Sequence, residues 1–336
     1  MNVFLTSVGR RAYMVKYFKQ VLGDEGTVHV CNSDDKTVAF HYADKRVIAP
    51  LIYDPSYISF LLEYCKENRI DILLSLFDID LPILAANKRR FEEIGTHVIV
   101  SDPEIVEICN DKWKTYQYLT ANNFHTPKTF LTLEQTLLAL ESGLLRYPII
   151  VKPRFGCGSI AMSVAEDELG LIYYYRRNTR AVNNTYLKYE SGTVDEKIIY
   201  QEYLHGQEYG ADIINDLKGR FQHVNIRKKI AMRAGETDIA ELIEEPEIYK
   251  ELKRLGTLTG HIANMDTDVF LVDGVPYVLE MNARFGGGYP FSHEGGCNLP
   301  KAIIDWCNGN TVGSQTLKAH AGAIGYKELY ITRGNL

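Results

Sequence analysis

The stretch VLEMNARFGGG, at residues 278–288, places a carboxylate, an amide, an arginine and three glycines in and after an apolar, strand-like run. Because side chains alternate between the two faces of a strand, we expect Glu280 and Asn282 to project from the same face. The residues expected on the opposite face are Tyr277, Leu279 and Met281. Grouped carboxylate and amide oxygens suit Mg²⁺, although an edge strand with one solvated face is an alternative interpretation.

The residues just upstream, in TDVFLVDGVPYVLEMN, predict a hairpin that turns at Asp273-Gly274. A loop of two residues would pair Asp268 with Leu279 and place its carboxylate on the wrong face. A loop of three residues, with Gly274 in a left-handed bulge position, would align Asp268 with Val278. The magnesium interpretation therefore requires the bulged loop.

In that register Asp268, Glu280 and Asn282 form one cluster of oxygen ligands for Mg²⁺. Arg284 follows just beyond the cluster, and its planar guanidinium can meet anionic oxygens there.

Composition narrows the function classes. The chain has 336 residues, a hydrophobic content of 46% and a formal net charge of −6. It is long enough for two or three domains, and its modest negative charge argues against a nucleic-acid-binding protein. The six cysteines form no CxxC pair, and the nine histidines form no HxH or HExxH motif, so we expect reduced thiols and no zinc site. With no leader-like or membrane-spanning run, we expect a cytoplasmic protein.

The first hundred residues alternate short apolar runs with amphipathic stretches. The runs NVFLTSV, TVHVCNS, RVIAP, DILLSLF and HVIVS are typical of strands, and AYMVKYFKQVLG and YISFLLEYCKEN are typical of the helices between them. This rhythm predicts a doubly wound parallel sheet. An NAD-dependent oxidoreductase would rest on this alternation alone, because the GxGxxG motif is missing.

A second stretch, VKPRFGCGSIAM at residues 151–162, places Lys152 at the end of a strand and follows it with a glycine-containing turn. Backbone N–H groups in such a turn can point at phosphate oxygens, and the lysine supplies a positive charge. It is not a P-loop, because GxxxxGK[ST] occurs nowhere in the chain.

A third stretch, IIYQEYLHGQEYG at residues 198–210, predicts a hairpin. Its extended Gln201–Leu204 segment can present backbone groups to an adenine edge, and Glu208 can accept hydrogen bonds from ribose hydroxyls.

Between the two hairpins, RKKIAMRAGETD gathers basic residues at 227–233. The face carrying Arg227, Lys229 and Arg233 is a candidate site for a substrate carboxylate or an acyl phosphate, and Glu236 for an amine. A solvated basic strand is the alternative, which we favour for at least two of the basic residues.

Four elements follow one another in the chain: Lys112 in DK, VKP with the glycine loop at residues 154–159, QEYLxGxE, and D…LEMNxR. Their order resembles the ATP-grasp superfamily over roughly residues 105–292. KPRFGCGSI and VLEMNARFGGG look most like carbamoyl phosphate synthase large chains and the PylC-like ligases. The resemblance implies an α/β and α+β fold with these domains: a pre-ATP-grasp domain at 1–104 and an ATP-grasp domain at 105–320, whose lid spans about 127–197 and whose core spans about 198–320.

The resemblance also implies which residues bind ATP and Mg²⁺. Lys112 and Lys152 would contact the phosphates, and Arg284 would lie beside the reacting phosphoryl group. The predicted catalytic set is Arg284 and Lys152, together with Arg233 from the basic strand. The remaining implied ATP ligands are Arg154, Gly156, Gly158 and Ser159 in the loop, Glu202, Tyr203 and Leu204 at adenine, and Glu208 at ribose. The implied metal ligands are Asp268, Glu280 and Asn282.

The implied function is ligation of a small carboxylate to an amine through an acyl phosphate, by a protein that can form homodimers. A kinase-like enzyme that stops at a phosphorylated product, or an ATP-sensing module without turnover, would share the ATP residues. Carbamoyl phosphate synthase large chains contain two such units and this chain has one, so complete carbamoyl phosphate synthesis is not expected. Cys157 lies in the glycine loop without a partner base and is not expected to be a nucleophile.

Overall fold

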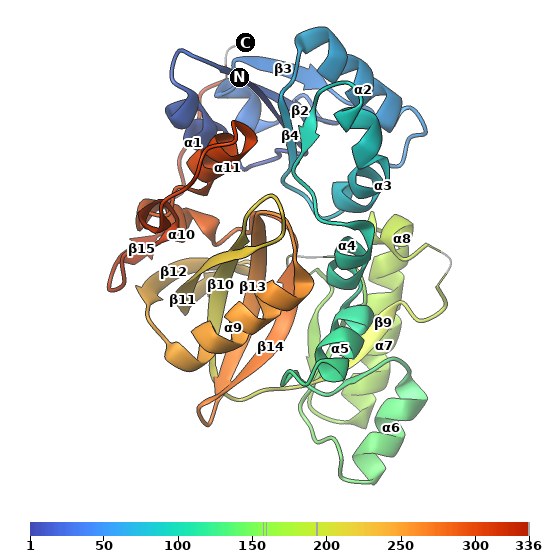
Figure 1. Cartoon of the computed structure of the whole chain (residues 1–336). Coiled ribbons are helices and arrows are strands. Elements are labelled where there is room, and N and C mark those ends of the chain that lie inside the picture. Colours follow the sequence, from blue (N-terminus) through green and yellow to red (C-terminus); the bar gives the residue numbers. More distant parts are fainter. Residues whose placement is uncertain (157, 159, 193, 335–336) are drawn as a thin grey trace.

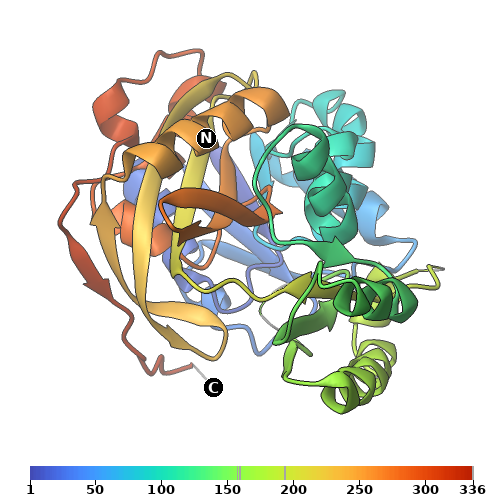
Figure 2. The ribbon, with the colours of Figure 1, turned by 90° about the horizontal axis from the view of Figure 1, so that it is seen from below.

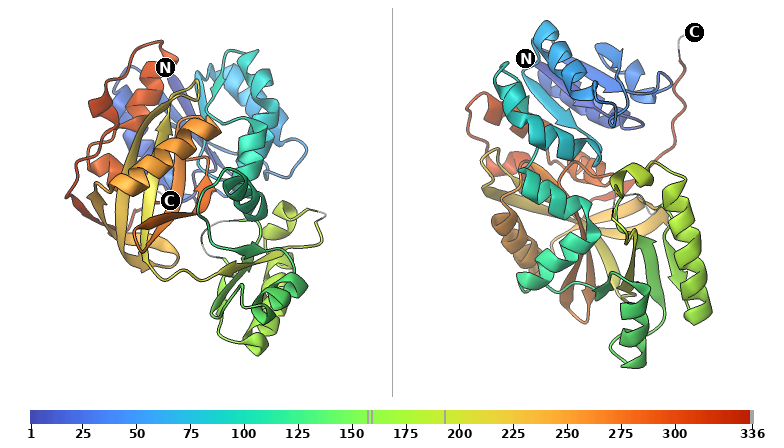
Figure 3. Two further views of the ribbon diagram at one scale, coloured as in Figure 1. Left: turned by 60° about the horizontal axis from the view of Figure 1, so that its bottom comes forward. Right: turned by 90° about the vertical axis from the view of Figure 1, so that its right-hand side faces the viewer.

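The computed structural model of the chain describes residues 1–156, 158, 160–192 and 194–334. Within these residues the strands form three sheets, one parallel and two antiparallel (Figure 1). The parallel sheet lies at one end of the molecule, and the large and small antiparallel sheets lie side by side at the other end (Figure 3). Across the described residues, no helix has both the length and the apolar character needed to cross a membrane.

The parallel sheet is built by the first hundred residues, and its strands follow the order β3-β2-β1-β4-β5. The strands are β1 (Asn2–Thr6), β2 (Thr27–Asn32), β3 (Lys45–Ile48), β4 (Ile72–Ser75) and β5 (His97–Val98). The intervening helices are α1 (Ala12–Leu22), η1 (Val38–His41), α2 (Tyr57–Asn68) and α3 (Asp80–Glu92). The predicted doubly wound parallel sheet is confirmed, and its strand order reverses between β1 and β4, where ligands of such sheets usually bind.

Alternating side chains of the parallel sheet pack into two different cores. Val3 and Leu5 of β1 face α1 and the distant helix α11 (Leu299–Cys307). Phe4, between them in sequence, faces α2 and α3 on the other side. The sheet is therefore covered on both faces, as its nearly continuous apolar strands require.

The small antiparallel sheet follows α4 (Pro103–Asn110) and α5 (Lys112–Ala121), and its strand order is β6-β9-β7-β8. Its strands are β6 (Thr129–Phe130), β7 (Ile149–Pro153), β8 (Ser163–Ala165) and β9 (Ile198–Glu202). Its helices are α6 (Leu133–Glu141), α7 (Glu168–Asn183) and α8 (Leu187–Glu190).

The large antiparallel sheet has the strand order β14-β13-β10-β11-β12-β15. Its strands are β10 (Gln207–Asn215), β11 (Phe221–Arg233), β12 (Glu236–Ile243), β13 (Asn264–Val272), β14 (Val275–Asn282) and β15 (Ile324–Tyr326). Helix α9 (Pro246–Thr259) lies along one face and packs Ile248, Leu252 and Leu255 into the core of this sheet (Figure 2). The other helices of this part are α10 (Tyr289–Glu294), α11 and α12 (Ser314–Leu317).

The hairpin predicted at residues 198–210 is wrong. Strand β9 pairs with β6 and β7 in the small sheet, whereas β10 pairs with β11 and β13 in the large sheet. The segment around Gly206 is thus a crossing between two sheets, and β9 of the small sheet lies just beyond the predicted range of about 127–197. The two apolar runs looked like partners because a glycine turn separates them, but each is buried against a different core.

The hairpin of β13 and β14 forms, but the predicted three-residue loop is wrong. Val272 pairs with Val275, so only Asp273 and Gly274 make the turn, and both have the positive φ of a type I′ turn, +49° and +80°. The extra residue is Leu279, inside β14, where the pairing shifts between Asp268–Glu280 and Val269–Val278. The bulge thus brings Asp268 onto the face of Glu280 by a different route from the predicted one.

Candidate active site

The face shared by β13 and β14 carries the polar residues of the opening stretch. Asp268 lies directly opposite Glu280, and Asp266 lies directly opposite Asn282. Directly opposed residues project from the same face of an antiparallel pair, so four oxygen-bearing side chains gather there. Behind them the buried residues are Val278 and Met281, not the predicted set of Tyr277, Leu279 and Met281, because the bulge changes the alternation at Leu279.

Glu280 is paired with a lysine from the small sheet. The ammonium of Lys152, only 5% exposed, lies 3.0 Å from Glu280 Oε1. Burial opposes ionisation of Glu280, but the charges of Lys152 and Lys112 outweigh it and lower the pKa of this carboxyl from 4.5 to about 2. Lys112 also donates a hydrogen bond to the backbone oxygen of Gly156, in the glycine loop. Two predicted phosphate-binding lysines and one predicted metal ligand therefore converge.

Asp268 is paired with a lysine from β11. Lys229 Nζ lies 2.7 Å from Asp268 Oδ1 and 2.5 Å from Glu208 Oε1, which links the predicted metal and ribose ligands. Burial is the largest influence on Asp268 and raises the pKa of its carboxyl to about 6, although Lys229 opposes the change. Burial favours the neutral form of Lys229, yet Asp268 and Glu208 together raise the pKa of its amine.

The donor set of this face fits Mg²⁺. Asp268 and Glu280 offer carboxylate oxygens, and Asn282 on the same face offers an amide oxygen, which are the hard ligands that this cation takes. Each carboxylate already balances a positive charge, since a lysine ammonium lies within 3.0 Å of it. Among the described residues, no group of three or more His, Cys, Asp or Glu side chains is arranged to hold a metal, so the set would consist of two carboxylates and one amide.

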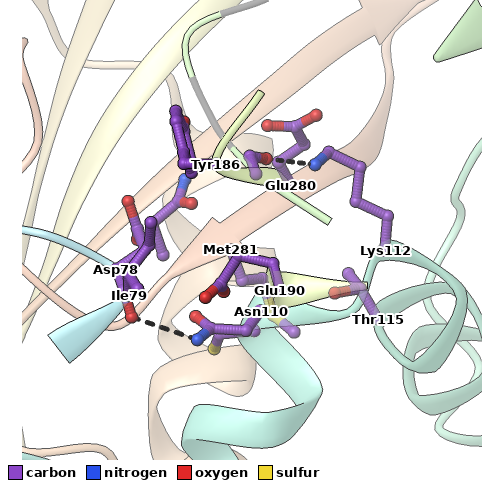
Figure 4. A pocket seen from close by; sticks show the side chains of 12 residues that line it. Asp78, Ile79, Asn110, Lys112, Thr115, Tyr186, Glu190, Glu280 and Met281 are labelled. Atoms are coloured by element: carbon purple, nitrogen blue, oxygen red, sulfur yellow. Dashed lines mark hydrogen bonds between the residues drawn. The ribbon is translucent and has the colours of Figure 1, made fainter. Parts of the chain in front are cut away.

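A pocket opens beside this face (Figure 4). Lys112 and Thr115 lie on one side of it, and Asp78 and Ile79, from the loop after β4, lie on the opposite side. Its described lining residues are Asp78, Ile79, Cys109, Asn110, Lys112, Thr115, Gly156, Tyr186, Glu190, Glu280, Met281 and Asn282. The residues that line the pocket therefore come from all three sheets or from the helices and loops attached to them.

The glycine loop that borders the pocket needs its glycines. Gly156 and Gly158 have φ of +92° and +70°, in the left-handed region that favours glycine. A Cβ atom at Gly156 would lie 2.3 Å from Leu187 of α8. The predicted Ser159, and Cys157 beside it, lie outside the described residues.

Arg154, predicted to bind ATP, is held by a carboxylate. Its Nε and Nη2 atoms donate to the two oxygens of Asp111 at 2.8 and 2.7 Å, and both side chains are buried. Asp111 also caps α5 by accepting hydrogen bonds from the backbone N–H groups of Trp113 and Lys114. The bidentate pair therefore fixes the start of the glycine loop against the helix that carries Lys112.

The predicted adenine segment lies in the crossing between the two antiparallel sheets. Glu202 binds the backbone and side chain of Lys128, with Nζ at 3.2 Å from Oε1. Tyr203 is exposed and Leu204 is half-buried. None of these three is among the described residues that line the pocket, so their contact with adenine stays a prediction.

A buried network of alternating charges lies behind Asn282. Arg284 binds Asp78 at 3.0 Å and Asp266 at 3.1 Å. Asp266 also binds Arg227 at 2.5 Å, and Arg227 binds Asp212 at 2.6 Å. Burial disfavours the charged form of Asp266, but Arg227 and Arg284 outweigh it and lower the pKa of its carboxyl. The predicted phosphoryl-binding Arg284 is thus oriented by one carboxylate from the parallel sheet and one from the large sheet.

Two of the glycines at 286–288 leave room for this network. A Cβ atom at Gly286 would lie 2.0 Å from Cγ of Asp266, and one at Gly288 would lie 2.2 Å from Nε of Arg227. At Gly287 the nearest atoms, in Glu236, are 3.7 Å away. Packing against this network therefore requires glycine at two of the three positions.

The basic residues of β11 that were predicted to face substrate form salt bridges with carboxylates of the same chain. Arg227 is 2% exposed and lies in the buried network, and Lys229 binds Asp268 and Glu208. Arg233, predicted as catalytic, pairs with Asp238 at 2.7 Å, and 53% of its side chain is exposed. Its proposed contact with substrate stays a prediction.

Sequence reasoning missed several members of the site. Asp78 follows β4 at the edge where ligands of a parallel sheet bind, so the strand pattern carried a usable signal for it. Asp266 precedes Asp268 by two residues and shares its face, which was a second signal. Asp212 lies inside the apolar run of β10 and had no local signal of function.

Comparison with known proteins gives two family matches. Residues 3–99 match the family described as PylC-like, N-terminal domain, and residues 109–288 match the family described as ATP-grasp domain. The two matches together span the parallel sheet, the small sheet and the β13–β14 hairpin.

Individual relatives are distant. The chain is 22% identical over 311 residues to a carbamoyl phosphate synthase large chain from Methanocorpusculum labreanum, a match that covers 87% of this chain and 28% of that protein. The chain thus corresponds to little more than a quarter of that relative's length.

Two solved structures share the fold. An L-amino acid ligase from Bacillus licheniformis has a TM-score of 0.73 at 22% identity, covering 99% of this chain and 81% of that one. The biotin carboxylase domain of Hydrogenobacter thermophilus 2-oxoglutarate carboxylase, solved with MgADP and bicarbonate, has a TM-score of 0.75 at 14% identity, covering 96% and 73%.

Proposed function

Because this chain belongs to the ATP-grasp family of ADP-forming ligases, matching it over residues 109–288, we propose that it joins a small carboxylate to an amine at the expense of ATP. The observation that carries the proposal is the convergence of Lys112, Lys152 and the glycine loop on the face of Glu280. That arrangement suits a triphosphate next to a divalent cation.

The proposed roles follow the positions of the side chains. Lys112 and Lys152 bind phosphate oxygens, Glu208 binds ribose, and the backbone around Tyr203 holds adenine. Asp268, Glu280 and Asn282 hold Mg²⁺, which when bound neutralises phosphate charge. The H. thermophilus structure that shares the fold was solved with MgADP, which supports this assignment.

In the proposed reaction a carboxylate oxygen of the substrate attacks the γ-phosphorus of ATP, and the bond from that phosphorus to the β-γ bridging oxygen breaks to release ADP. The nitrogen lone pair of an amine then attacks the acyl carbon, phosphate leaves, and the nitrogen loses a proton. The chemistry requires positioning and charge stabilisation and no protein nucleophile. Arg284, which binds Asp78 and Asp266, has the proposed role of stabilising charge on the transferred group.

The proposed class of substrates rests on analogy with a relative of similar length. The ligase from B. licheniformis is described as acting on L-amino acids, and 99% of this chain matches it in fold. Amino acids are therefore the first acids and amines to test. A homodimer is proposed only on the resemblance to the family.

The test measures ADP and phosphate release from Mg-ATP with pools of amino acids and small carboxylic acids. We expect release with a particular acid and amine, and a loss of about 100-fold or more in Glu280→Gln. Glu244→Gln, at a carboxylate whose side chain is 72% exposed, is the matched control and should retain full activity.

Hydroxylamine trapping distinguishes turnover from ATP sensing, and analysis of the product distinguishes a ligase from a kinase. If an acyl phosphate forms, hydroxylamine should trap it as a hydroxamate whenever the correct acid is present. Release of ADP with an acid alone, and a stable phosphorylated product, would favour the kinase-like alternative. Tight binding of Mg-ATP without ADP release in any pool would contradict the ligase proposal and favour a sensing module.

A further inference from the structure

Arg11, from the loop after β1, lies beside Arg284. Arg11 Nη1 donates a hydrogen bond to the backbone oxygen of Phe285 at 2.7 Å, and Arg284 Nη1 lies 3.4 Å from that same oxygen. Because both nitrogens contact the same oxygen atom, the distance between them cannot exceed the sum of these two distances. A residue of the parallel sheet domain therefore extends the positively charged part of the proposed active site.

The loop that carries Arg11 has a fixed shape. Ser7 and Gly9 both have positive φ, +51° and +46°, and the Ser7 hydroxyl lies 2.8 Å from each oxygen of Asp80. Asp80 is fully buried and also accepts a hydrogen bond from Thr6 at 2.7 Å. A serine at positive φ is an unfavourable conformation that the surrounding contacts must hold. Arg11 is therefore presented from a rigid turn.

The two neighbouring guanidinium groups differ in their partners. Arg284 is bound by two carboxylates, Asp78 and Asp266. Among the salt bridges of the described residues, none involves Arg10 or Arg11. Arginine forks of this kind match carboxylate and phosphate groups in planar, two-point contacts.

Glu236, an acidic group influenced by the charges of Arg10 and Arg11, already has its own partner. Glu236 Oε2 lies 3.0 Å from Lys327 Nζ. Burial opposes ionisation of Glu236, but Lys327, and to a smaller extent Arg10 and Arg11, lower the pKa of its carboxyl. The two arginines thus lie within electrostatic range of Glu236 without being paired to it.

We propose that Arg11 binds a second anionic group of the acid substrate, so that this substrate is a dicarboxylic acid or a phosphorylated carboxylic acid. The inference rests on the proposed function, in which the first carboxylate reacts beside Arg284. The site lies at the carboxyl end of β1, where the strand order of the parallel sheet reverses and ligands usually bind.

Binding of matched pairs of probes tests the proposal without any turnover. The pairs are L-glutamate with L-glutamine, L-aspartate with L-asparagine, and O-phospho-L-serine with L-serine. Each is titrated by calorimetry into the full chain saturated with Mg²⁺ and a non-hydrolysable ATP analogue. We expect the anionic member of at least one pair to bind roughly tenfold or more tightly than its neutral partner. The amino acid pairs and the phosphoserine pair distinguish a carboxylate from a phosphate.

Variants of Arg11 test whether this residue causes the preference for the anionic probe. Arg11→Ala should weaken binding of the preferred anionic probe by roughly 10- to 100-fold, with little effect on its neutral partner or on the ATP analogue. Arg11→Lys, which keeps the charge, should weaken it less. Arg46→Ala, at an exposed arginine of β3, is the control and should bind like the unmodified chain.

Equal binding of both members in every pair, or no binding of either, overturns the proposal. Arg11→Ala weakening both members of the preferred pair equally also overturns it. If the anionic probes bind as expected and ADP is still not released with any acid and amine, the proposed ligase function fails and the anion site stands.

Discussion

Asp78 accepts hydrogen bonds from Nε and Nη2 of Arg284 at 3.1 and 3.0 Å, although 206 residues separate the two in sequence. Asp78 belongs to the parallel sheet domain and lines the pocket, whereas Arg284 follows the last strand of the β13–β14 hairpin. This pair therefore joins two parts of the fold at the proposed site of phosphoryl transfer.

Asp78→Asn should destabilise the protein by about 3 kcal/mol, because it leaves a buried guanidinium with one of its two carboxylates. The free energy of unfolding from urea titrations at pH 7 measures the effect. Glu244→Gln breaks the exposed pair with Lys318, in which 72% and 47% of the side chains are exposed, and should cost less than about 1 kcal/mol. Equal losses in the two variants would show that the Asp78 pair contributes no more than a surface contact.

The glycines at 286–288 offer a comparison within three consecutive residues. Gly286→Ala and Gly288→Ala should each cost at least about 1 to 3 kcal/mol, because the new methyl group would overlap Asp266 or Arg227. Gly287→Ala should be nearly neutral for stability, since its nearest contact is 3.7 Å. Thermal unfolding of the three variants provides the measurement, and a loss at Gly287 equal to the other two would contradict the packing explanation.

Glu280 should make stability depend on pH at the acid end. Its folded pKa of about 2 lies below the ordinary 4.5, so its ionised form stabilises the fold above pH 4.5. This contribution, of about 3 kcal/mol, should be lost as the pH falls from 4.5 toward 2. The difference in unfolding free energy between the unmodified chain and Glu280→Gln should shrink by that amount over the same range. A difference that does not change with pH would exclude the pairing with Lys152 as the cause.

Tyr53 joins the parallel sheet domain to the helix that borders the pocket. Its hydroxyl donates to Glu190 Oε1 at 2.6 Å, and its ring stacks on Tyr189 at 4.5 Å between centroids. Tyr53→Phe should keep the stacking and remove the hydrogen bond, so amide exchange in Leu187–Glu190 should become faster. Hydrogen exchange followed by mass spectrometry measures this, with Tyr330→Phe at an 81% exposed tyrosine as the control. Unchanged exchange in α8 would show that the hydrogen bond does not hold this helix.

The sequence predicted those parts of the fold that local patterns encode. Alternating apolar runs identified the parallel sheet, and Asp273-Gly274 identified the hairpin turn. The bulge at Leu279 carries no glycine or other turn residue. The sequence pattern therefore predicts the unpaired residue in the loop between β13 and β14 instead of inside β14. The pattern of β9 and β10 predicts a hairpin because nothing local distinguishes a hairpin from a crossing between two sheets.

The candidate site was predictable where residues act close together in sequence, as in Glu280 and Asn282. The roles of Arg227 and Lys229 were not, because their partners Asp212, Asp266 and Asp268 lie on other strands. A basic strand with distant carboxylates and a basic strand facing substrate have the same sequence pattern. Only the register of the strands separates them.

The core shared by β1 and α11 has a consequence for synthesis of the chain on the ribosome. Leu299, Ala302 and Ile303 pack in the same core as Val3 and Leu5, so the part of this face that α1 leaves uncovered stays open until residues near 300 have been made. A fragment cut at the predicted boundary of residue 104 would keep that part of the face exposed to water and would tend to aggregate. The amino-terminal residues therefore depend, for part of their burial, on a helix made almost three hundred residues later.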